Sequence, residues 1–122
     1  MTISQPAGSM PLPQVVNVTI TQPGTIANAG TYTSEAIATY GMRHIAVTGQ
    51  ITNAGTLSLQ RYLDLDASVT AGAAVTAAMS ASTQATIDNL GTVICQSAKV
   101  SIINGATTSA TISGLAVVLA AS

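Results

Sequence analysis

The sequence predicts an all-β domain: an antiparallel β-sandwich of immunoglobulin-like or jelly-roll type, built from about seven or eight short strands. Three observations support this prediction. Apolar and polar residues alternate along many short segments, turn residues separate those segments at short intervals, and no long segment has a convincing helical period. With 122 residues, of which 48% are hydrophobic, the chain is long enough for one core and too apolar for disorder.

The first 14 residues are expected to form an extended arm without a core of its own. They contain three of the four prolines, Pro6, Pro11 and Pro13. Two interpretations stay open: a disordered terminus, or an arm that reaches onto a neighbouring subunit. On the second interpretation these prolines are candidate interface residues, because proline lowers the entropy cost of ordering an arm. The segment has neither the basic start nor the apolar stretch of a secretory signal.

Residues 15–122 are predicted to form the single sandwich domain. Its first strand covers residues 15–20, where Val16, Val18 and Ile20 alternate with polar residues, and it ends at the turn residues Pro23 and Gly24. A weaker strand is expected over residues 31–39.

The stretch from Met42 to Asp66 is predicted to be one β-hairpin with its turn at residues 50–56. A period of two places one set of apolar residues on a single face: Ile45, Val47, Ile51, Leu57, Leu59, Leu63 and Leu65. The other face carries the polar set: His44, Thr48, Gln50, Ser58, Gln60, Tyr62 and Asp64. The first face should therefore be core, and the second should meet water or a partner.

Arg61 interrupts the apolar face of this predicted hairpin. An unpaired guanidinium among leucines is costly, so two arrangements are considered. Either the stem of the side chain extends to solvent at the sheet edge, or the charge crosses a subunit interface to a carboxylate such as Glu35 or Asp88.

The remainder of the chain is also read as strands. Residues 69–90 are expected to form two strands around the loop 80–82, because β-branched residues outweigh the helix-favouring alanines. Strands are also predicted at residues 99–103 and 109–120, with a bulge at Gly114. The pattern I-x-N-A-G-T occurs at residues 26–31 and again at 51–56, which indicates repeated turn chemistry before a strand.

The composition of the chain, in which charged residues make up only 6%, excludes several functions. Three Lys or Arg residues and no Phe or Trp do not form a nucleic-acid-binding surface. The longest apolar run, residues 115–121, is too short to span a membrane. The surface must consist mostly of Ser, Thr, Asn, Gln and Ala, which suits a protein packed against others.

Residues capable of catalysis or metal binding are scarce, and we predict no enzyme, metal site, cofactor or small-molecule substrate. The chain has one His and one Cys, too few for a zinc site, and it lacks a nucleophile elbow or a phosphate-binding glycine loop. Cys95, between apolar neighbours, is expected to be buried. Asp64 and Asp66 lack the further oxygen ligands that calcium requires, so a solvated strand end is the preferred interpretation.

Several features together resemble the small all-β decoration, or cement, proteins of tailed-phage capsids. They are the Ala-, Thr-, Ser- and Val-rich strands, the block at residues 49–62, the closing segments 99–104 and 110–114, and the proline-rich arm. The resemblance covers residues 15–122. It implies a virion protein on the outer capsid surface, a homotrimer that binds the major capsid protein and stabilises the shell. It carries no residue-level motif.

The candidate interface residues outside the arm are Arg43, His44, Arg61 and Tyr62. Two other functions remain open. An adhesive or carbohydrate-binding β-sandwich of a phage fibre or tail would use the tyrosines, of which only Tyr32, Tyr40 and Tyr62 are present. An ice-binding protein would suit the Thr- and Ala-rich composition but lacks a regular T-x-T array.

Overall fold

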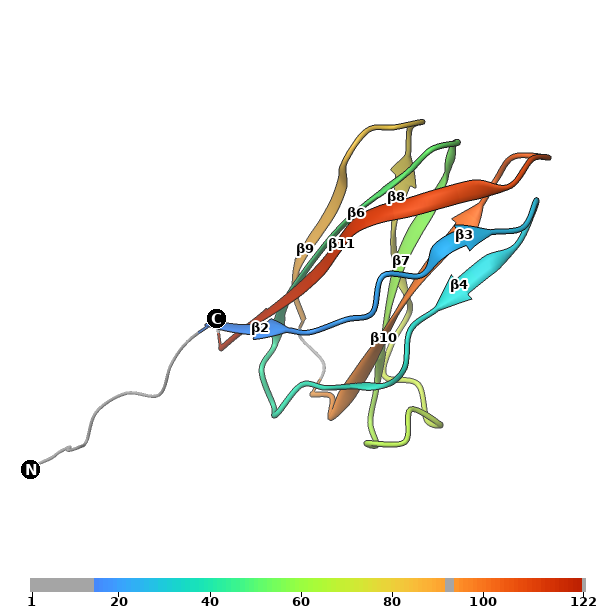
Figure 1. Cartoon of the computed structure of the whole chain (residues 1–122). Helices are drawn as coiled ribbons and strands as arrows, with labels where there is room; N and C mark the ends of the chain where they lie inside the picture. Colours follow the sequence, from blue (N-terminus) through green and yellow to red (C-terminus); the bar gives the residue numbers. More distant parts are fainter. Residues whose placement is uncertain (1–14, 92–93, 122) are drawn as a thin grey trace, which may run out of the picture.

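The computed structural model describes residues 15–91 and 94–121, and within these ranges the chain is entirely β, with no helix. The predicted arm, with Pro6, Pro11 and Pro13, lies outside the described residues. The strands, labelled as in Figure 1, are β2 (Val15–Val18), β3 (Gly24–Ile26), β4 (Thr31–Thr33), β5 (Ile37–Ala38), β6 (His44–Ile51), β7 (Gly55–Tyr62), β8 (Val75–Met79), β9 (Ala85–Leu90), β10 (Ser97–Asn104) and β11 (Ala110–Ala120).

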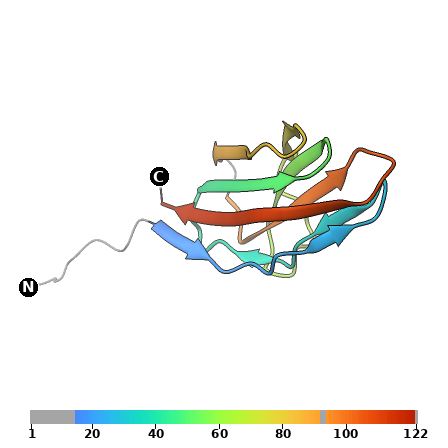
Figure 2. The same cartoon turned by 45° about the horizontal axis from the view of Figure 1, so that its top comes forward.

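Two antiparallel sheets pack face to face, as the sequence predicts (Figures 1 and 2). One sheet has the order β4, β10, β7, β8, and β5 also pairs with β10. The other has the order β2, β11, β6, β9, and β3 also pairs with β11. Side chains from both inner faces form one core, whose fully buried members include Ile45, Val47, Leu57, Leu59, Val100, Ile102 and Leu119.

The strand order identifies the sandwich as a jelly roll. Because β2 and β3 lie along the same neighbour, β11, and β4 and β5 along β10, each of these pairs acts as one interrupted strand. Counted in this way, the structure has the eight strands of a jelly roll, within the predicted number. In one sheet β2, at the start of the described chain, pairs with the last strand, β11. In the other sheet β4 pairs with β10. These pairings differ from the immunoglobulin order.

The predicted hairpin from Met42 to Asp66 is wrong in its pairing. β6 and β7 form, but they belong to opposite sheets: β6 pairs with β9 and β11, and β7 with β8 and β10. A strand with one buried face has the same period of two whether its successor lies beside it or across the core. The assignment of faces is therefore confirmed for both strands even though the pairing is not.

The apolar face ends earlier than predicted. β7 stops at Tyr62, and the chain then turns, so Leu63 and Leu65 are 47% and 60% exposed rather than buried. Asp64 and Asp66 consequently lie in this turn and not on a strand. Periodicity alone does not reveal where a strand ends.

The remaining strands follow the prediction with adjustments at their ends. The weak strand expected over residues 31–39 is split into β4 and β5. Two strands, β8 and β9, flank the loop around Ser82, as expected, although they join different sheets. The bulge is confirmed: Gly114 has φ of +61°, and the register of β11 against β6 shifts between Ser113 and Ala116.

The repeated pattern I-x-N-A-G-T occupies equivalent places on both sides of β10. Its first copy leads into β4 and its second into β7, and these are the two neighbours of β10. Thr31 and Thr56 both pair with Ile103. The two copies therefore form similar turns, each of which precedes a strand that pairs with β10.

Candidate functional site

One end of the sandwich carries most of the large exposed apolar side chains. We call this the apolar end, defined by Tyr40, Leu63, Leu65, Val69, Leu90 and Ile94. Leu90 is the last residue of β9, and the others come from the β5–β6, β7–β8 and β9–β10 connections, which lie together at the end of the sandwich where β2 begins and β11 finishes (Figures 1 and 2). The strand register also places these strand ends together, because His44, the first residue of β6, pairs with Leu90 at the end of β9 and with Ala120 at the end of β11.

The opposite end of the sandwich has a different composition. Its connections are the short segments 27–30, 52–54, 80–84 and 105–109, which contain small and polar residues. Large apolar groups exposed on a soluble domain commonly mark a contact surface when they gather in one place. The asymmetry between the two ends therefore makes the apolar end the first candidate for a binding surface.

Three of the sequence-predicted interface residues lie at this end. Arg43 is exposed immediately before β6, His44 begins β6, and Tyr62 ends β7. Arg43 Nε donates a hydrogen bond to the carbonyl oxygen of Gly91 at 3.0 Å. His44 Nε2 and the Asp88 carboxylate form an ion pair if the imidazole is protonated. A role for these residues in an interface stays a prediction.

Arg61 points into the molecule. Only 6% of the residue is exposed, so the predicted placement at a solvent-facing sheet edge is wrong. The guanidinium hydrogen-bonds inside the chain, with Asn89 Oδ1 at 2.6 Å and with the carbonyl oxygen of Arg43 at 2.9 Å. The other considered arrangement, a carboxylate supplied across an interface, stays a prediction.

The loop that carries Leu63 and Leu65 is organised by Asp64. Its carboxylate accepts hydrogen bonds from the Ser68 hydroxyl and from the backbone N–H groups of Ser68 and Val69, the latter two at 3.0 Å. The Ser68 hydroxyl contributes most to holding the pKa of Asp64 below its usual value, followed by the Val69 N–H. The exposed leucines are thus presented by a loop with its own hydrogen-bond framework.

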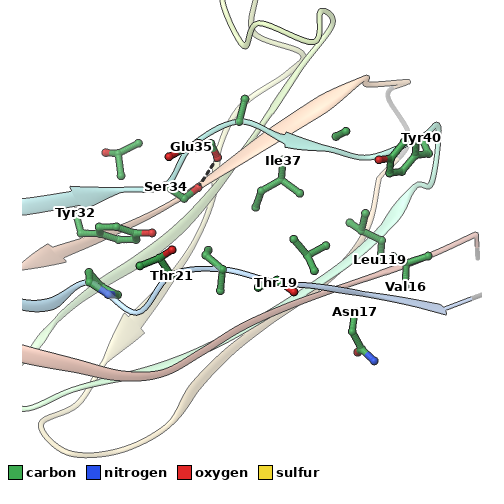
Figure 3. A pocket seen from close by; sticks show the side chains of 16 residues that line it. Val16, Asn17, Thr19, Thr21, Tyr32, Ser34, Glu35, Ile37, Tyr40 and Leu119 are labelled. Atoms are coloured by element: carbon green, nitrogen blue, oxygen red, sulfur yellow. Dashed lines mark hydrogen bonds between the residues drawn. The ribbon is translucent and has the colours of Figure 1, made fainter.

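A second candidate site is the groove along the open side of the sandwich, between β2 and the β4–β5 segment (Figure 3). Its volume is about 650 Å³. Figure 3 shows Tyr32 and Tyr40 at opposite ends of the groove, with Glu35 on the β4–β5 side. Burial, with a smaller contribution from the nearby Glu35 carboxylate, raises the pKa of Tyr32. The lining thus combines aromatic, hydroxyl and carboxylate groups.

Groups that could hold a metal ion do not gather in the part of the chain that the structure describes: no three His, Cys, Asp or Glu side chains lie together there. Cys95 is a free, buried thiol, as predicted, and its carbonyl oxygen accepts a hydrogen bond from the Thr39 hydroxyl at 3.1 Å. No membrane-spanning helix occurs within residues 15–91 and 94–121.

The geometry defines a class, the two-sheet jelly-roll sandwich, and comparisons with solved structures support an all-β fold. No protein-family model and no curated protein matches the chain. Among solved structures, it is similar to the PBSX exported protein XepA, with a TM-score of 0.60 and 12% identity over 90% of this chain. The chain spans only 39% of the length of XepA.

A second similar structure is PirA, with a TM-score of 0.51 and 10% identity, covering 93% of this chain and 98% of PirA. A chain of the T13 IBDV viral particle is more distant, with a TM-score of 0.48 and 16% identity over 88% of this chain and 31% of that one. At these identities the XepA and PirA matches show the shared all-β fold alone.

Sequence reasoning missed most of the apolar end. The alternation predicts Leu63 and Leu65 as core residues, and it does not identify Leu90 and Ile94 as exposed; Tyr40 is predicted only as one of the tyrosines open to a sugar ligand. The available signal was the high turn content around these residues, since an apolar side chain in a connection is not placed inside by strand alternation.

Proposed function

We propose that the chain is a structural virion protein that binds the outer surface of a capsid and stabilises the shell, with the major capsid protein as its partner. The observation that carries this proposal is the gathering of exposed apolar side chains at one end of the sandwich. The similarity in fold to an exported protein of PBSX, and the use of jelly rolls in viral capsids, are compatible with it.

The surface chemistry suits attachment to a large protein assembly. Charged residues are 6% of the chain, and those in the connections of the apolar end, Arg43, Asp64 and Asp66, can pair with charges of a partner at the rim while the apolar side chains are buried. Burial of exposed apolar surface contributes about 25 cal/mol per Å². Many copies on one shell can therefore reinforce it through modest individual interfaces.

As part of this proposal the protein acts as a homotrimer. The solution mass, measured by light scattering coupled to size exclusion, should be close to three times 12.1 kDa, in the free protein or after release from capsids. A monomer under both conditions would overturn the trimeric arrangement without affecting the capsid-binding proposal.

Co-sedimentation with capsids of the virus that encodes the chain tests the capsid-binding proposal. The double variant Leu65→Asp, Ile94→Asp places two charges on the apolar end at residues that are 60% and 75% exposed, so folding should be preserved. We expect it to lose binding. The control Ala81→Asp adds a charge to an exposed loop at the opposite end and should bind normally. Equal binding by the wild type and the double variant, or none by the wild type, would refute the proposal.

A second candidate function, an adhesive or carbohydrate-binding domain, is favoured by one specific observation. Two of the three tyrosines, Tyr32 and Tyr40, line the open groove together with hydroxyl groups. Aromatic rings that stack on sugar faces and polar groups that bind their hydroxyls are what such a site requires.

A glycan array tests this alternative. Binding to defined glycans that is lost in Tyr40→Ala and retained in Tyr62→Ala would favour the adhesive function, because Tyr62 does not line the groove. Absence of any glycan binding would leave the capsid proposal as the better one.

A further inference from the structure

Two arginines converge on the backbone of Gly91 beside the apolar end. Arg43 Nε donates to the carbonyl oxygen of Gly91 at 3.0 Å. The Arg61 guanidinium packs so closely on Gly91 that a Cβ at this position would lie 2.7 Å from Arg61 Cζ. Within residues 15–91 and 94–121, the one ion pair within 4.0 Å is His44 with Asp88, so neither arginine has a carboxylate partner there.

Arg61 is the more demanding of the two because it is buried. A guanidinium has five N–H donors and does not lose its proton in proteins. The three hydrogen bonds that Arg61 donates all go to neutral oxygens: Asn89 Oδ1 at 2.6 Å, the Asn89 carbonyl at 3.1 Å and the Arg43 carbonyl at 2.9 Å. Its Nε is buried and has no hydrogen-bond partner among the residues that the structure describes. A buried charge normally pairs with an opposite one, and within the described parts of the chain no carboxylate pairs with Arg61.

Space for such a group exists next to Arg61. A cavity of about 240 Å³ is bordered by Arg61, by Asn89 and by the small residues Ala71, Gly72 and Ala73 of the β7–β8 connection. Because Gly72 and Ala73 are exposed, a ligand can approach from solvent. The small side chains of this connection leave the room that a larger residue would fill.

From the unpaired, buried Arg61 and the cavity beside it, we infer that this position is a binding site for a carboxylate or a similar oxyanion. Guanidinium groups recognise planar oxyanions through charge-assisted hydrogen bonds. Such an oxyanion has two possible sources: an acidic side chain or C-terminus of another protein, or a small free anion. The inference does not depend on the proposed capsid function, although a carboxylate from a capsid protein would connect the two.

The first experiment supplies the missing charge from within the chain. Ala73→Glu places a carboxylate on the wall of the cavity, Ala73→Gln places the uncharged equivalent there, and Ala74→Glu adds the same charge at the adjacent exposed position, which does not line the cavity. We expect Ala73→Glu to melt at least about 4 °C above both controls at neutral pH and low salt.

The second experiment uses free anions. The Nε–H resonance of Arg61, assigned by comparison with Arg61→Lys, is followed by NMR while acetate or sulfate replaces chloride at constant ionic strength. A saturable shift would identify a small free oxyanion as a ligand. Stabilisation by Ala73→Glu without a saturable shift would identify a carboxylate carried by another protein. If Ala73→Glu is no more stable than Ala73→Gln and neither anion shifts the resonance, the inference is refuted.

Discussion

The side-chain amide of Gln22 makes two hydrogen bonds with the backbone of Leu115. Gln22 Nε2 donates to the Leu115 carbonyl oxygen at 2.8 Å, and Gln22 Oε1 accepts from the Leu115 N–H at 3.0 Å. Leu115 lies within the bulge, where β11 is out of register with β6, and between β2 and β3, where the neighbouring edge strand is interrupted. A side chain thus replaces the backbone partner that Leu115 would have in a continuous strand.

Removal of this amide should therefore destabilise the domain. We expect Gln22→Ala to lower the free energy of unfolding by about 1 to 2 kcal/mol, because the N–H and the carbonyl oxygen of the buried Leu115 both lose their hydrogen-bond partner. Urea denaturation followed by circular dichroism measures the change. Gln96→Ala, at an exposed position, is the control and should change stability by less than about 0.5 kcal/mol. Equal stability of the two variants would contradict this account of the bulge.

The side chain of Asn104 also forms hydrogen bonds with backbone groups, at the end of the sandwich opposite the apolar end. The residue is 1% exposed, and its Nδ2 donates to the carbonyl oxygens of Ala27 at 3.0 Å and Thr108 at 2.8 Å, while Oδ1 accepts from the Ala106 N–H at 3.1 Å. One amide therefore joins the β3–β4 and β10–β11 connections.

Asn104→Ala should cost about 2 to 3 kcal/mol of unfolding free energy, since three partly buried backbone groups in two connections lose their hydrogen-bond partner and a buried side chain is removed. Thermal and urea unfolding provide the measurement. Asn28→Ala removes an exposed asparagine from the β3–β4 connection and should be close to neutral. A loss for Asn104→Ala no larger than for Asn28→Ala would show that water replaces these bonds.

Gly55 allows close approach of two strands. A Cβ at this position would lie 2.3 Å from the carbonyl oxygen of Ile103, which belongs to β10, the hydrogen-bonded neighbour of β7 in the same sheet. We predict that Gly55→Ala destabilises the domain by more than about 2 kcal/mol, because the obstacle is backbone and cannot turn away. Ala54→Ser, at the exposed neighbour, is the control for a substitution in this connection. Near-wild-type unfolding of Gly55→Ala would mean that β7 and β10 can separate at this point without loss.

The sequence was sufficient to predict the sandwich and the buried face of each long strand, because apolar and polar residues alternate wherever one side of a sheet is buried and the other is exposed. It was insufficient to predict pairing. Ile51 and Leu57 are buried whether β6 and β7 form a hairpin or face each other across the core, and the short connection between them permits both arrangements. Pairing is decided by strands distant in the sequence, above all β10 and β11.

The candidate site was harder to predict for a related reason. Arg43, His44 and Tyr62 are predicted as candidate interface residues, and they lie at the apolar end. The leucines that define that end were assigned to the interior, since apolar character alone does not distinguish a core position from an exposed loop. The burial of Arg61 could not be foreseen, because its partners are backbone carbonyls and Asn89, brought there by the fold.

The hydrogen bonds of Asp64 predict a pH dependence for the loop that presents Leu63 and Leu65. The pKa of Asp64 is lowered in the folded chain, chiefly by the Ser68 hydroxyl, so the loop is held in place above the ordinary pKa of the carboxyl group. This contribution is lost as the pH falls through the lowered, folded-state pKa.

Ser68→Ala should move the Asp64 pKa upward, as followed by an NMR titration of its carboxyl carbon, and should increase hydrogen exchange at the Val69 N–H. Ser80→Ala, in an exposed loop at the opposite end, should leave the Asp64 titration unchanged. An Asp64 pKa that is the same in Ser68→Ala and in the wild type would show that this hydroxyl does not order the loop.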